Sequence, residues 1–434
     1  MDKIEIKSSD YFFKGNMQVP ADKSIAHRAL FIASLNKDMT KISNLAMSED
    51  VRTIASDLQT TIKCLADIGV QFAEVKGNIF VRGRGAKEFV ASEGILDCGN
   101  SGTTARLMMG LLSGQSFESR LDGDDSLRTR PMGRVIEPLQ KMGASILSTE
   151  GNLPLAISPS QLKGLKFNLE LGSAQVKTAL IFAALCAEGE TRLKEIKKSR
   201  NHTEIMLKSC TSNLTIENDE IIIQPEPKIE IESFDIPGDP SSAAFFIVAA
   251  LLNKNSELNI KNVCLNSTRV HFIEILKKMG AEIETTNAHE ISGELIGDVL
   301  VKSSNLKSIK IEKDSIPLVI DEIPILSLAC SVAEGTSEIL DAGELRFKES
   351  DRIKTTVSEL KKLGSDIEET DNGILIKGKD SLKGSDCESH MDHRIAMTLA
   401  IAGTIAKGLT SIKEPGCVSI SFPNFFETLN NFRK

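Results

Sequence analysis

The chain repeats one pattern six times: an apolar helix, a strand, an amphipathic helix and more strand, at intervals of roughly 65 to 80 residues. In the first copy the pattern predicts helices over 24–35 and 50–68, a strand over 40–45 and a strand pair around 70–81. Each copy is too long for a solenoid repeat. Two domains of three copies each are therefore the simplest organisation.

The first helix of each copy is apolar on nearly every face, as in ALFIASL, ALIFAALCA and AAFFIVAALL. Helices of this length and composition are typical of buried cores rather than of membrane spans. We therefore expect an α/β fold in which internal helices pack against surrounding sheets. Pro237, Gly238 and Pro240 punctuate the chain near its middle. We assign 22–236 to an N-terminal domain and 1–21 plus 237–434 to a C-terminal domain, although the periodicity does not show where 1–21 belong.

Composition excludes several classes of function. The net charge of −8 argues against nucleic acid as a partner, because phosphate backbones require a basic face. The eight cysteines are scattered without paired spacing, so neither a disulfide framework nor a zinc site is indicated. The opening residues, MDKIEIKSSDYFF, have no apolar run of the kind expected in a leader, and no run in the sequence approaches the length needed to span a bilayer. These features predict a cytoplasmic protein that binds neither membranes nor nucleic acid.

The segment LDCGNSGTTARLMMGLL, residues 96–112, is a glycine turn followed by an apolar helix. Gly99 and Gly102 leave backbone N–H groups uncovered beside a helix start, where the first-turn donors and the dipole favour an anion. Arg106 can add a planar fork of donors suited to carboxylate or phosphate. An ordinary strand-to-helix turn is the simpler interpretation of this segment alone.

Cations and hydroxyls recur at other predicted helix entrances, in PADKSIAHR, DDSLRTRPMGR, GSAQVK, SRNHTE and DHR. Taken singly, each is also explained by helix capping and solvated charge. Their recurrence in both halves predicts two domains that face one another across a cleft and clamp anionic substrates. The residues concerned are Lys23, Ser24, Arg28, Arg130, Ser173, Gln175, Arg200 and Arg394.

The segment ELRFKESDR, residues 344–352, is densely charged and contains Lys348, Glu349 and Arg352. Asp321 precedes the buried helix of the same copy, and a carboxylate beside a buried element is suited to proton transfer. His390 and His393 have the spacing of a ligand pair, but no further ligand pattern completes a metal site. We therefore predict acid–base chemistry without a metal.

These motifs make the chain resemble the 5-enolpyruvylshikimate-3-phosphate (EPSP) synthase family of enolpyruvyl transferases over nearly its whole length. The matching stretches are DKSIAHR, GNSGTTARLMMGLL, SLRTRPMGRVIEPLQKMGA, GSAQVKTAL, ELRFKESDR, DHRIAM and SFPNFF. The resemblance implies an α/β fold of two globular domains, each with three βαβαββ units, buried helices and an active-site cleft between the domains.

The resemblance also implies the reaction: shikimate 3-phosphate and phosphoenolpyruvate (PEP) give an enolpyruvyl ether and phosphate through a tetrahedral intermediate, with no cofactor, and a monomer is plausible. By motif position, the shikimate 3-phosphate ligands would be Lys23, Ser24, Arg28, Ser173, Gln175, Arg200, Asp321 and Lys348. The PEP ligands would be Lys23, Gly102, Arg130, Arg352 and Arg394. The acid–base residues would be Asp321 and Glu349, with Lys23.

The chain departs from the family pattern at Ile420, where some members carry a lysine that contacts PEP just before SFP. Two other functions are compatible with parts of this pattern. The related transferase that acts on UDP-N-acetylglucosamine carries a loop cysteine and a different lysine motif, so DKSIAHR and SLRTRPM argue against it. An inactive protein that only binds phosphorylated metabolites is disfavoured by the presence of Lys23, Asp321, Glu349 and Arg394.

Overall fold

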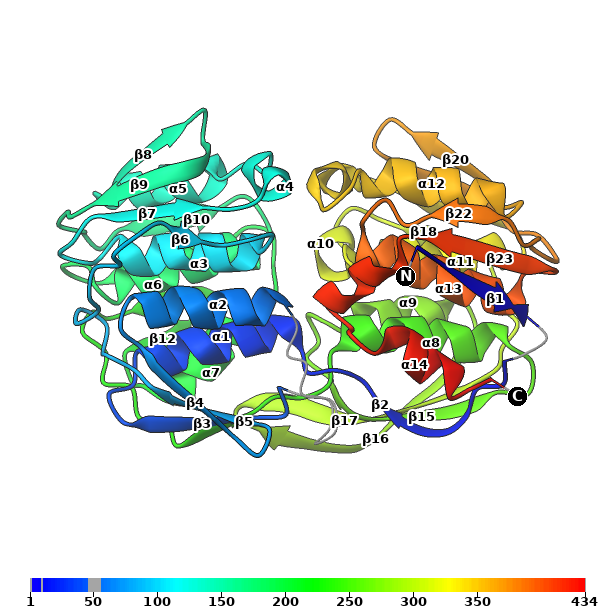
Figure 1. Ribbon diagram of the computed structural model, residues 1–434, viewed down its shortest axis with the longest axis horizontal. Coiled ribbons are helices and arrows are strands. Elements are labelled where there is room, and N and C mark those ends of the chain that lie inside the picture. Colours follow the sequence, from blue (N-terminus) through cyan, green and yellow to red (C-terminus); the bar gives the residue numbers. More distant parts are fainter. Residues whose placement is uncertain (1, 9–10, 46–55, 434) are drawn as a thin grey trace. The chain divides into compact units, whose positions relative to one another are not determined.

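The computed structural model comprises two compact units (Figure 1). The structure describes residues 2–8, 11–45 and 56–433. The N-terminal unit consists of 21–236 and 291–294, and the C-terminal unit of 1–20, 237–290 and 295–434.

The N-terminal unit alternates helices and short strands. In chain order its elements are α1 (Lys23–Ser34), β3 (Met39–Ser43), α2 (Ser56–Asp67), β4 (Gln71–Val75), β5 (Asn78–Arg82), β6 (Leu96–Asp97), α3 (Gly102–Leu112), β7 (Ser119–Asp122), α4 (Asp125–Arg128), α5 (Gly133–Lys141), β8 (Ser145–Thr149), β9 (Asn152–Ser158), β10 (Lys166–Leu169), α6 (Ala174–Ala184), β11 (Thr191–Glu195), α7 (His202–Lys208), β12 (Leu214–Glu217), β13 (Glu220–Ile223) and β14 (Ser233–Asp235).

The C-terminal unit has the same alternation. Its elements are β1 (Lys3–Lys7), β2 (Lys14–Gln18), α8 (Pro240–Leu252), β15 (Glu257–Cys264), α9 (His271–Lys278), β16 (Glu282–Ile291), β17 (Glu294–Lys302), β18 (Lys310–Ile311), α10 (Ile316–Val319), α11 (Ile323–Ser331), β19 (Thr336–Ile339), the 3-10 helix η2 (Gly343–Phe347), α12 (Arg352–Lys362), β20 (Asp366–Thr370), β21 (Gly373–Lys377), β22 (Asp386–Glu388), α13 (His393–Ile405), β23 (Leu409–Lys413), the 3-10 helix η3 (Pro415–Ile420) and α14 (Phe425–Asn430).

The third repeat shows the shared βαβαββ topology. Strand β10 pairs in parallel with β11 through the crossover helix α6, and β12 and β13 form an antiparallel hairpin whose second strand pairs with β11. A parallel pair needs such a crossover, and a helix supplies it. The sheet order β10-β11-β13-β12 recurs as β6-β7-β9-β8 and as β18-β19-β21-β20. The mixed α/β fold of repeated units is therefore as the sequence predicts.

Three repeats complete their sheets with strands from elsewhere in the chain. β14 pairs in parallel with β3, although more than 180 residues separate them in sequence. β2 pairs in parallel with β15. In the last repeat β1 lies antiparallel to β23 where other repeats have a hairpin, so this sheet has three strands. A local periodicity cannot reveal such pairings, because the partner strands are distant in sequence.

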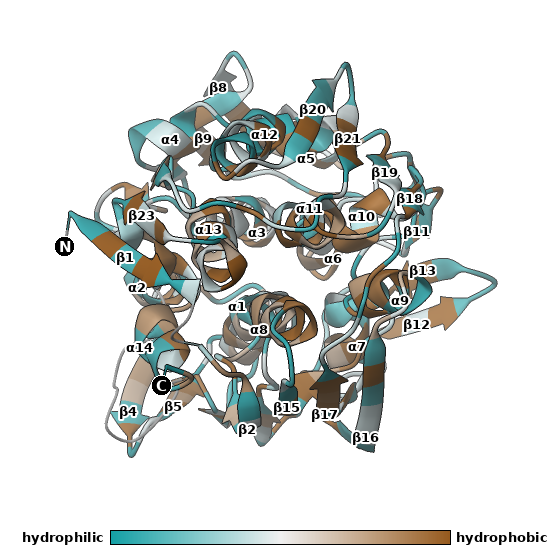
Figure 2. Cartoon of the chain, turned by 90° about the vertical axis from the view of Figure 1, so that its right-hand side faces the viewer, coloured by the Kyte–Doolittle hydropathy of each residue, from teal (hydrophilic) through white to brown (hydrophobic). Residues whose placement is uncertain are grey.

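An apolar helix from each repeat lies in the interior of its unit. α3 and α6 pack so closely that a Cβ on Gly110 would lie 2.2 Å from the carbonyl oxygen of Ala179, which explains the glycine. In the C-terminal unit α8, α11 and α13 pack against one another. Figure 2 shows these three helices brown over much of their surface, with strands of the unit lying outside them. Among the described residues no helix is long and apolar enough to cross a membrane.

Both helices predicted for the first repeat form, and α1 begins and ends one residue before the predicted range 24–35. The helix predicted over 50–68 is observed as α2, and residues 50–55 lie outside the described part of the chain. In the last repeat α14 covers only six residues and starts after Pro423 and Asn424. Proline has no N–H to donate within a helix, which disfavours helix through this position.

Candidate active site

The N-terminus of α1 carries three of the predicted ligand residues. Asp22 caps the helix, because its carboxylate accepts a hydrogen bond from the backbone N–H of Ile25 at 2.9 Å. Lys23 Nζ lies 3.0 Å from Asp57 Oδ2 on α2. The hydroxyl of Ser24 accepts from Arg200 NH1 at 3.4 Å, which links the start of α1 to the segment before α7. Residues 176 positions apart thus meet at one helix entrance.

Arg28 is almost fully buried and joins α1 to α6 and α7. Its Nε donates to Thr203 Oγ1 at 2.7 Å, and its NH2 donates to Thr178 Oγ1 at 3.2 Å. Its NH1 donates to the backbone carbonyl of Ser24 at 2.8 Å. All three acceptors are neutral oxygens, so these contacts orient the guanidinium without cancelling its charge.

Ser101 caps α3, whose first residue is Gly102. A Cβ on Gly102 would lie 3.0 Å from Arg106 NH1 and 3.6 Å from Arg130 NH1, so two guanidinium groups approach this helix start. Arg130 NH2 donates to Asn100 Oδ1 at 2.8 Å. The arrangement combines helix N-terminal donors with two cations, which is a favourable environment for an anion.

Gln175 and Ser173 lie at the entrance of α6. Arg106 NH1 donates to Gln175 Oε1 at 2.5 Å, and Gln175 Nε2 donates to Thr103 Oγ1 at 2.9 Å, so α6 and α3 are joined by polar contacts. Ser173 caps α6 through its hydroxyl, which accepts from Val176 N at 3.4 Å. The capping role that the sequence suggested for Ser173 is therefore present, and the hydroxyl retains capacity for another hydrogen bond.

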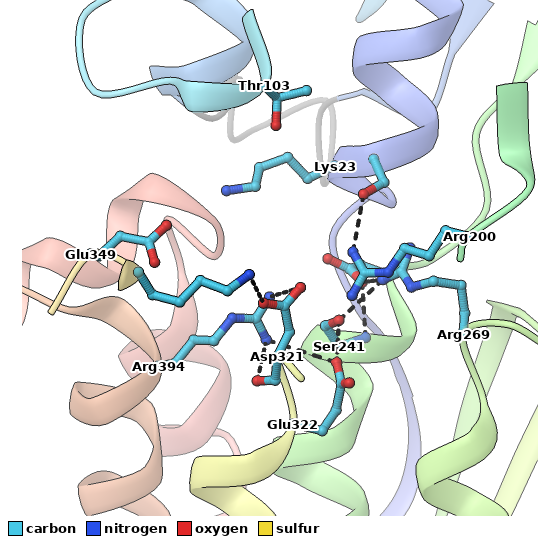
Figure 3. A network of polar contacts seen from close by, with 12 residues as sticks. Lys23, Thr103, Arg200, Ser241, Arg269, Asp321, Glu322, Glu349 and Arg394 are labelled. Atoms are coloured by element: carbon cyan, nitrogen blue, oxygen red, sulfur yellow. Dashed lines mark hydrogen bonds and ion pairs between the residues drawn. The ribbon is translucent and has the colours of Figure 1, made fainter. Parts of the chain in front are cut away.

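In the C-terminal unit, three cations contact Asp321, which lies between α10 and α11. Figure 3 shows one of them, Arg394, beside Asp321. Its Oδ1 is 3.5 Å from Lys348 Nζ and 3.4 Å from Arg352 NH1. Its Oδ2 is 3.6 Å from Arg394 NH2, and Arg394 NH1 also donates to the Asp321 carbonyl at 3.0 Å. The Asp321 side chain remains 14% exposed, so it is accessible as well as strongly paired.

Arg352, the first residue of α12, is fully buried among carboxylates. Its Nε donates to Asp392 Oδ2 at 2.8 Å and its NH2 to Glu349 Oε2 at 2.5 Å. Burial by itself lowers the pKa of Arg352, but the charges of Asp392 and Glu349 outweigh it and raise this pKa. Burial likewise favours neutral Asp392, yet the charge of Arg352 prevails and the pKa of Asp392 is lowered.

Asp392 also positions Arg394. Its Oδ1 accepts from the backbone N–H of Arg394 at 2.9 Å and caps α13. The buried pair of Arg352 and Asp392 therefore fixes the start of the helix that carries Arg394. Nearby, His390 Nε2 contacts Glu359 Oε1 at 2.8 Å, so this imidazole packs against a carboxylate.

Sequence reasoning missed three polar residues of this region, namely Asp239, Ser241 and Arg269. Arg269 NH2 donates to Asp239 Oδ1 at 2.8 Å and to Ser241 Oγ at 3.0 Å. The Ser241 hydroxyl in turn donates to Glu322 Oε1. Asp239 and Pro240 could have signalled a helix start, but nothing local to the sequence announces a buried Arg269.

Comparisons with known proteins show the family to which the chain is similar. Residues 11–429 match the sequence profile of a family described as EPSP synthase (3-phosphoshikimate 1-carboxyvinyltransferase). A Thermoanaerobacter sp. (strain X514) protein of that name is 47% identical over 429 residues, covering 98% of this chain and 99% of that protein. The protein of that name from Petrotoga mobilis is 45% identical over 437 residues, covering 99% of each. An EPSP synthase structure from Acinetobacter baumannii superposes with a TM-score of 0.87 at 37% identity, covering 100% of this chain and 98% of that one.

Proposed function

The chain belongs to the EPSP synthase family, the 3-phosphoshikimate 1-carboxyvinyltransferases of the shikimate pathway, and we propose that Asp321 and Glu349 are its principal acid–base pair. The enzyme transfers the enolpyruvyl group of PEP to shikimate 3-phosphate. In this proposal the shikimate 5-hydroxyl adds to C2 of PEP while C3 gains a proton. C3 then returns a proton, the bond from C2 to the phosphate oxygen breaks and phosphate leaves.

Asp321 accepts the proton of the 5-hydroxyl, and Glu349 with Lys23 supplies the proton to C3. The observation that most supports this is the group of three cations around Asp321, because cations that contact a carboxylate favour its ionised form, which is the form that accepts a proton. Arg352 contacts both Asp321 and Glu349, so one guanidinium lies between the two proposed acid–base carboxylates.

The remaining ligand assignments follow the same proposal. Each unit contributes cations whose charge can stabilise the phosphate and carboxylate groups of the substrates and the charge that develops in the intermediate. Shikimate 3-phosphate is bound by Lys23, Ser24, Arg28, Ser173, Gln175, Arg200, Asp321 and Lys348. PEP is bound by Lys23, Gly102, Arg130, Arg352 and Arg394.

The assignment of Asp321 is tested with the Asp321→Asn variant, which keeps the size of the side chain and removes its capacity to accept the proton. We expect phosphate release from PEP in the presence of shikimate 3-phosphate to fall to the background rate. Calorimetric binding of shikimate 3-phosphate should stay within a few-fold of the wild-type value, because the other ligands remain.

The matched control is Asp314→Asn, the same chemical change at an exposed position a few residues earlier. This variant should turn over normally. Near-normal turnover of Asp321→Asn would remove Asp321 from its catalytic role. UDP-N-acetylglucosamine, offered in place of shikimate 3-phosphate, should release no phosphate from PEP with any of these proteins.

We also propose that the segments 22–236 and 1–21 plus 237–434 act as the two domains of a cytoplasmic monomer that needs neither a metal nor another cofactor. Each of the two compact units has its own buried helices, which supports this division. Light scattering coupled to size exclusion measures the oligomeric state. Turnover after treatment with a chelator measures any requirement for a metal ion.

A further inference from the structure

Beside Arg394 in the C-terminal unit, four buried polar side chains are connected in series. Figure 3 labels three of them, Ser241, Arg269 and Glu322. Their residues are only 1% to 5% exposed, and they come from α8, the segment before it, the segment before α9 and the residue that precedes α11. These residues are Asp239, Ser241, Arg269 and Glu322. None of them belongs to the ligand residues proposed above.

The hydrogen bonds of this series have a fixed direction. Arg269 has only donors, so its NH2 donates to Ser241 Oγ at 3.0 Å. The single hydroxyl proton of Ser241 is then directed to Glu322 Oε1. Glu322 Oε1 lies 3.9 Å from Arg394 NH1. Charge therefore alternates from Asp239 through Arg269 and Glu322 to Arg394.

The position of Glu322 is unusual for a residue at a helix start. Glu322 immediately precedes α11, yet its side chain makes no capping hydrogen bond to that helix. The carboxylate is directed instead to Ser241 and Arg394. Isolated buried charges are costly, and buried ion pairs are often no better for stability than apolar residues of the same size. Stability alone therefore gives a weak reason for four polar groups here.

We infer that Glu322, oriented by Ser241 and Arg269, is a positioning residue that holds the guanidinium of Arg394 from its buried side. Arg394 also donates to the Asp321 carbonyl at 3.0 Å, so it is fixed by two neighbouring residues of one segment. The Glu322 carboxylate attracts Arg394 at 3.9 Å and sets where its donors point. This inference rests on the proposed role of Arg394 in binding PEP.

The test is the Glu322→Gln variant, which keeps the shape of the side chain and an oxygen that accepts from Ser241 but removes the charge facing Arg394. We expect the KM for PEP to rise about tenfold, the size of effect typical for loss of a charge-assisted contact. The kcat should fall less than threefold, and binding of shikimate 3-phosphate alone should stay within twofold. A residue with only a structural role would not change one substrate selectively.

The matched control is Asp298→Asn, the same loss of charge at another buried carboxylate of this unit. Asp298 accepts from Asn262 N at 3.0 Å and from Asn287 Nδ2 at 2.9 Å, and neither partner is a proposed ligand. This variant should lose thermal stability while its KM for PEP stays within twofold of wild type. It shows how far a general loss of stability alone changes the kinetics.

Ser241→Ala tests the series. Because Ser241 acts through Glu322, its removal should raise the KM for PEP about threefold in the wild-type background and less than 1.5-fold in the Glu322→Gln background. If Ser241→Ala raised the KM for PEP equally in both backgrounds, Ser241 would not act through Glu322. For Glu322 itself, a KM for PEP within twofold of wild type would overturn the inference.

Arg394→Ala separates this inference from the proposed function. If Arg394→Ala raises the KM for PEP at least 100-fold and Glu322→Gln does not raise it, the positioning role fails and the ligand role stands. If Arg394→Ala leaves the KM for PEP unchanged, the ligand assignment fails, and the inference fails with it.

Discussion

The hydrogen bonds that the structure describes for arginines of the candidate site differ between the two units, although Lys23 of the N-terminal unit also pairs with a carboxylate, that of Asp57. In the N-terminal unit, the hydrogen bonds described for Arg28, Arg106 and Arg130 end on hydroxyl, amide and backbone oxygens. In the C-terminal unit, Arg352 and Arg394 contact carboxylates. A neutral acceptor orients a cation and leaves its charge available to an anion, whereas a carboxylate partner cancels charge and is itself able to take up a proton.

This difference suits the proposed division of labour. Cations oriented by neutral groups favour the binding of phosphate and carboxylate, which is the role proposed for most ligands of the N-terminal unit. Carboxylates can give and take protons, and both proposed acid–base carboxylates, Asp321 and Glu349, lie in the C-terminal unit. If the distinction is physical, then removing a cation should cost more where its partners are charged.

Arg352→Met gives the largest expected effect. The variant leaves Asp392 buried without its charge partner, and we expect about 3–5 kcal/mol less free energy of unfolding in urea together with a loss of turnover. The second change Asp392→Asn, made in the Arg352→Met background, removes the uncompensated charge and should restore part of the stability. A double variant no more stable than Arg352→Met would show that the buried charge is not the cause.

Arg28→Met gives the contrasting measurement in the N-terminal unit. Loss of the Arg28 guanidinium removes hydrogen bonds to neutral groups. The hydroxyls of Thr178 and Thr203, which lie 2.6 Å apart, can still hydrogen-bond to one another. We expect a loss of about 1–3 kcal/mol in the free energy of unfolding, smaller than for Arg352→Met in the same urea titration. If Arg28→Met and Arg352→Met lost equal stability, the claim that a cation with charged partners costs more to remove would be wrong.

Much of the fold follows from the sequence, because a helix that is apolar on every face must lie inside a core. The ends of α1 differ from the predicted range 24–35 by one residue. Pairing between distant strands, as of β14 with β3, has no local signal, because register and partner depend on tertiary packing.

Part of the candidate site can likewise be predicted from the sequence, and part cannot. Cations at helix entrances are visible in the sequence, since capping and glycine patterns mark where helices begin. Which carboxylate each cation meets is not visible, as Arg352 and Asp392 are 40 residues apart and join only in the folded unit. The predicted active-site cleft between the domains stays a prediction.

His27 makes the N-terminal unit sensitive to mild acid. It lies fully buried on α1 with Nδ1 2.8 Å from Thr61 Oγ1, and burial lowers its pKa to about 3. The unfolded chain takes up a proton near pH 6.5, whereas the folded chain does not until about pH 3. Stability should therefore fall as pH drops from about 6.5 toward 3, by up to about 1.4 kcal/mol per pH unit.

His27→Gln should flatten this slope when urea unfolding is measured at several pH values between 7 and 4.5. The control is His271→Gln in the C-terminal unit. His271 is only partly buried and its pKa is lowered, chiefly by that burial, so its replacement should flatten the slope less. An unchanged slope in His27→Gln would show that other groups cause the acid sensitivity.

The smallest expected effect concerns a buried hydroxyl for which the structure shows no hydrogen-bond partner among the described residues, Thr356 Oγ1 on α12. Thr355, its neighbour on the same helix, donates instead to the Asp351 carbonyl at 2.9 Å. Burying an unsatisfied hydroxyl is costly, so Thr356→Val should raise the free energy of unfolding by about 1 kcal/mol. Thr355→Val removes a satisfied hydrogen bond and should instead leave stability unchanged or lower it. The change in the free energy of unfolding would then depend on the hydrogen-bond partner of the replaced side chain. The loss of stability should be largest for Arg352→Met, whose partners are charged, and smaller for Arg28→Met, whose described partners are neutral. For Thr356→Val, whose hydroxyl has no described partner, stability should rise. If Thr356→Val lowered the free energy of unfolding in the same urea titration, this ranking of the variants would be wrong for the buried hydroxyl.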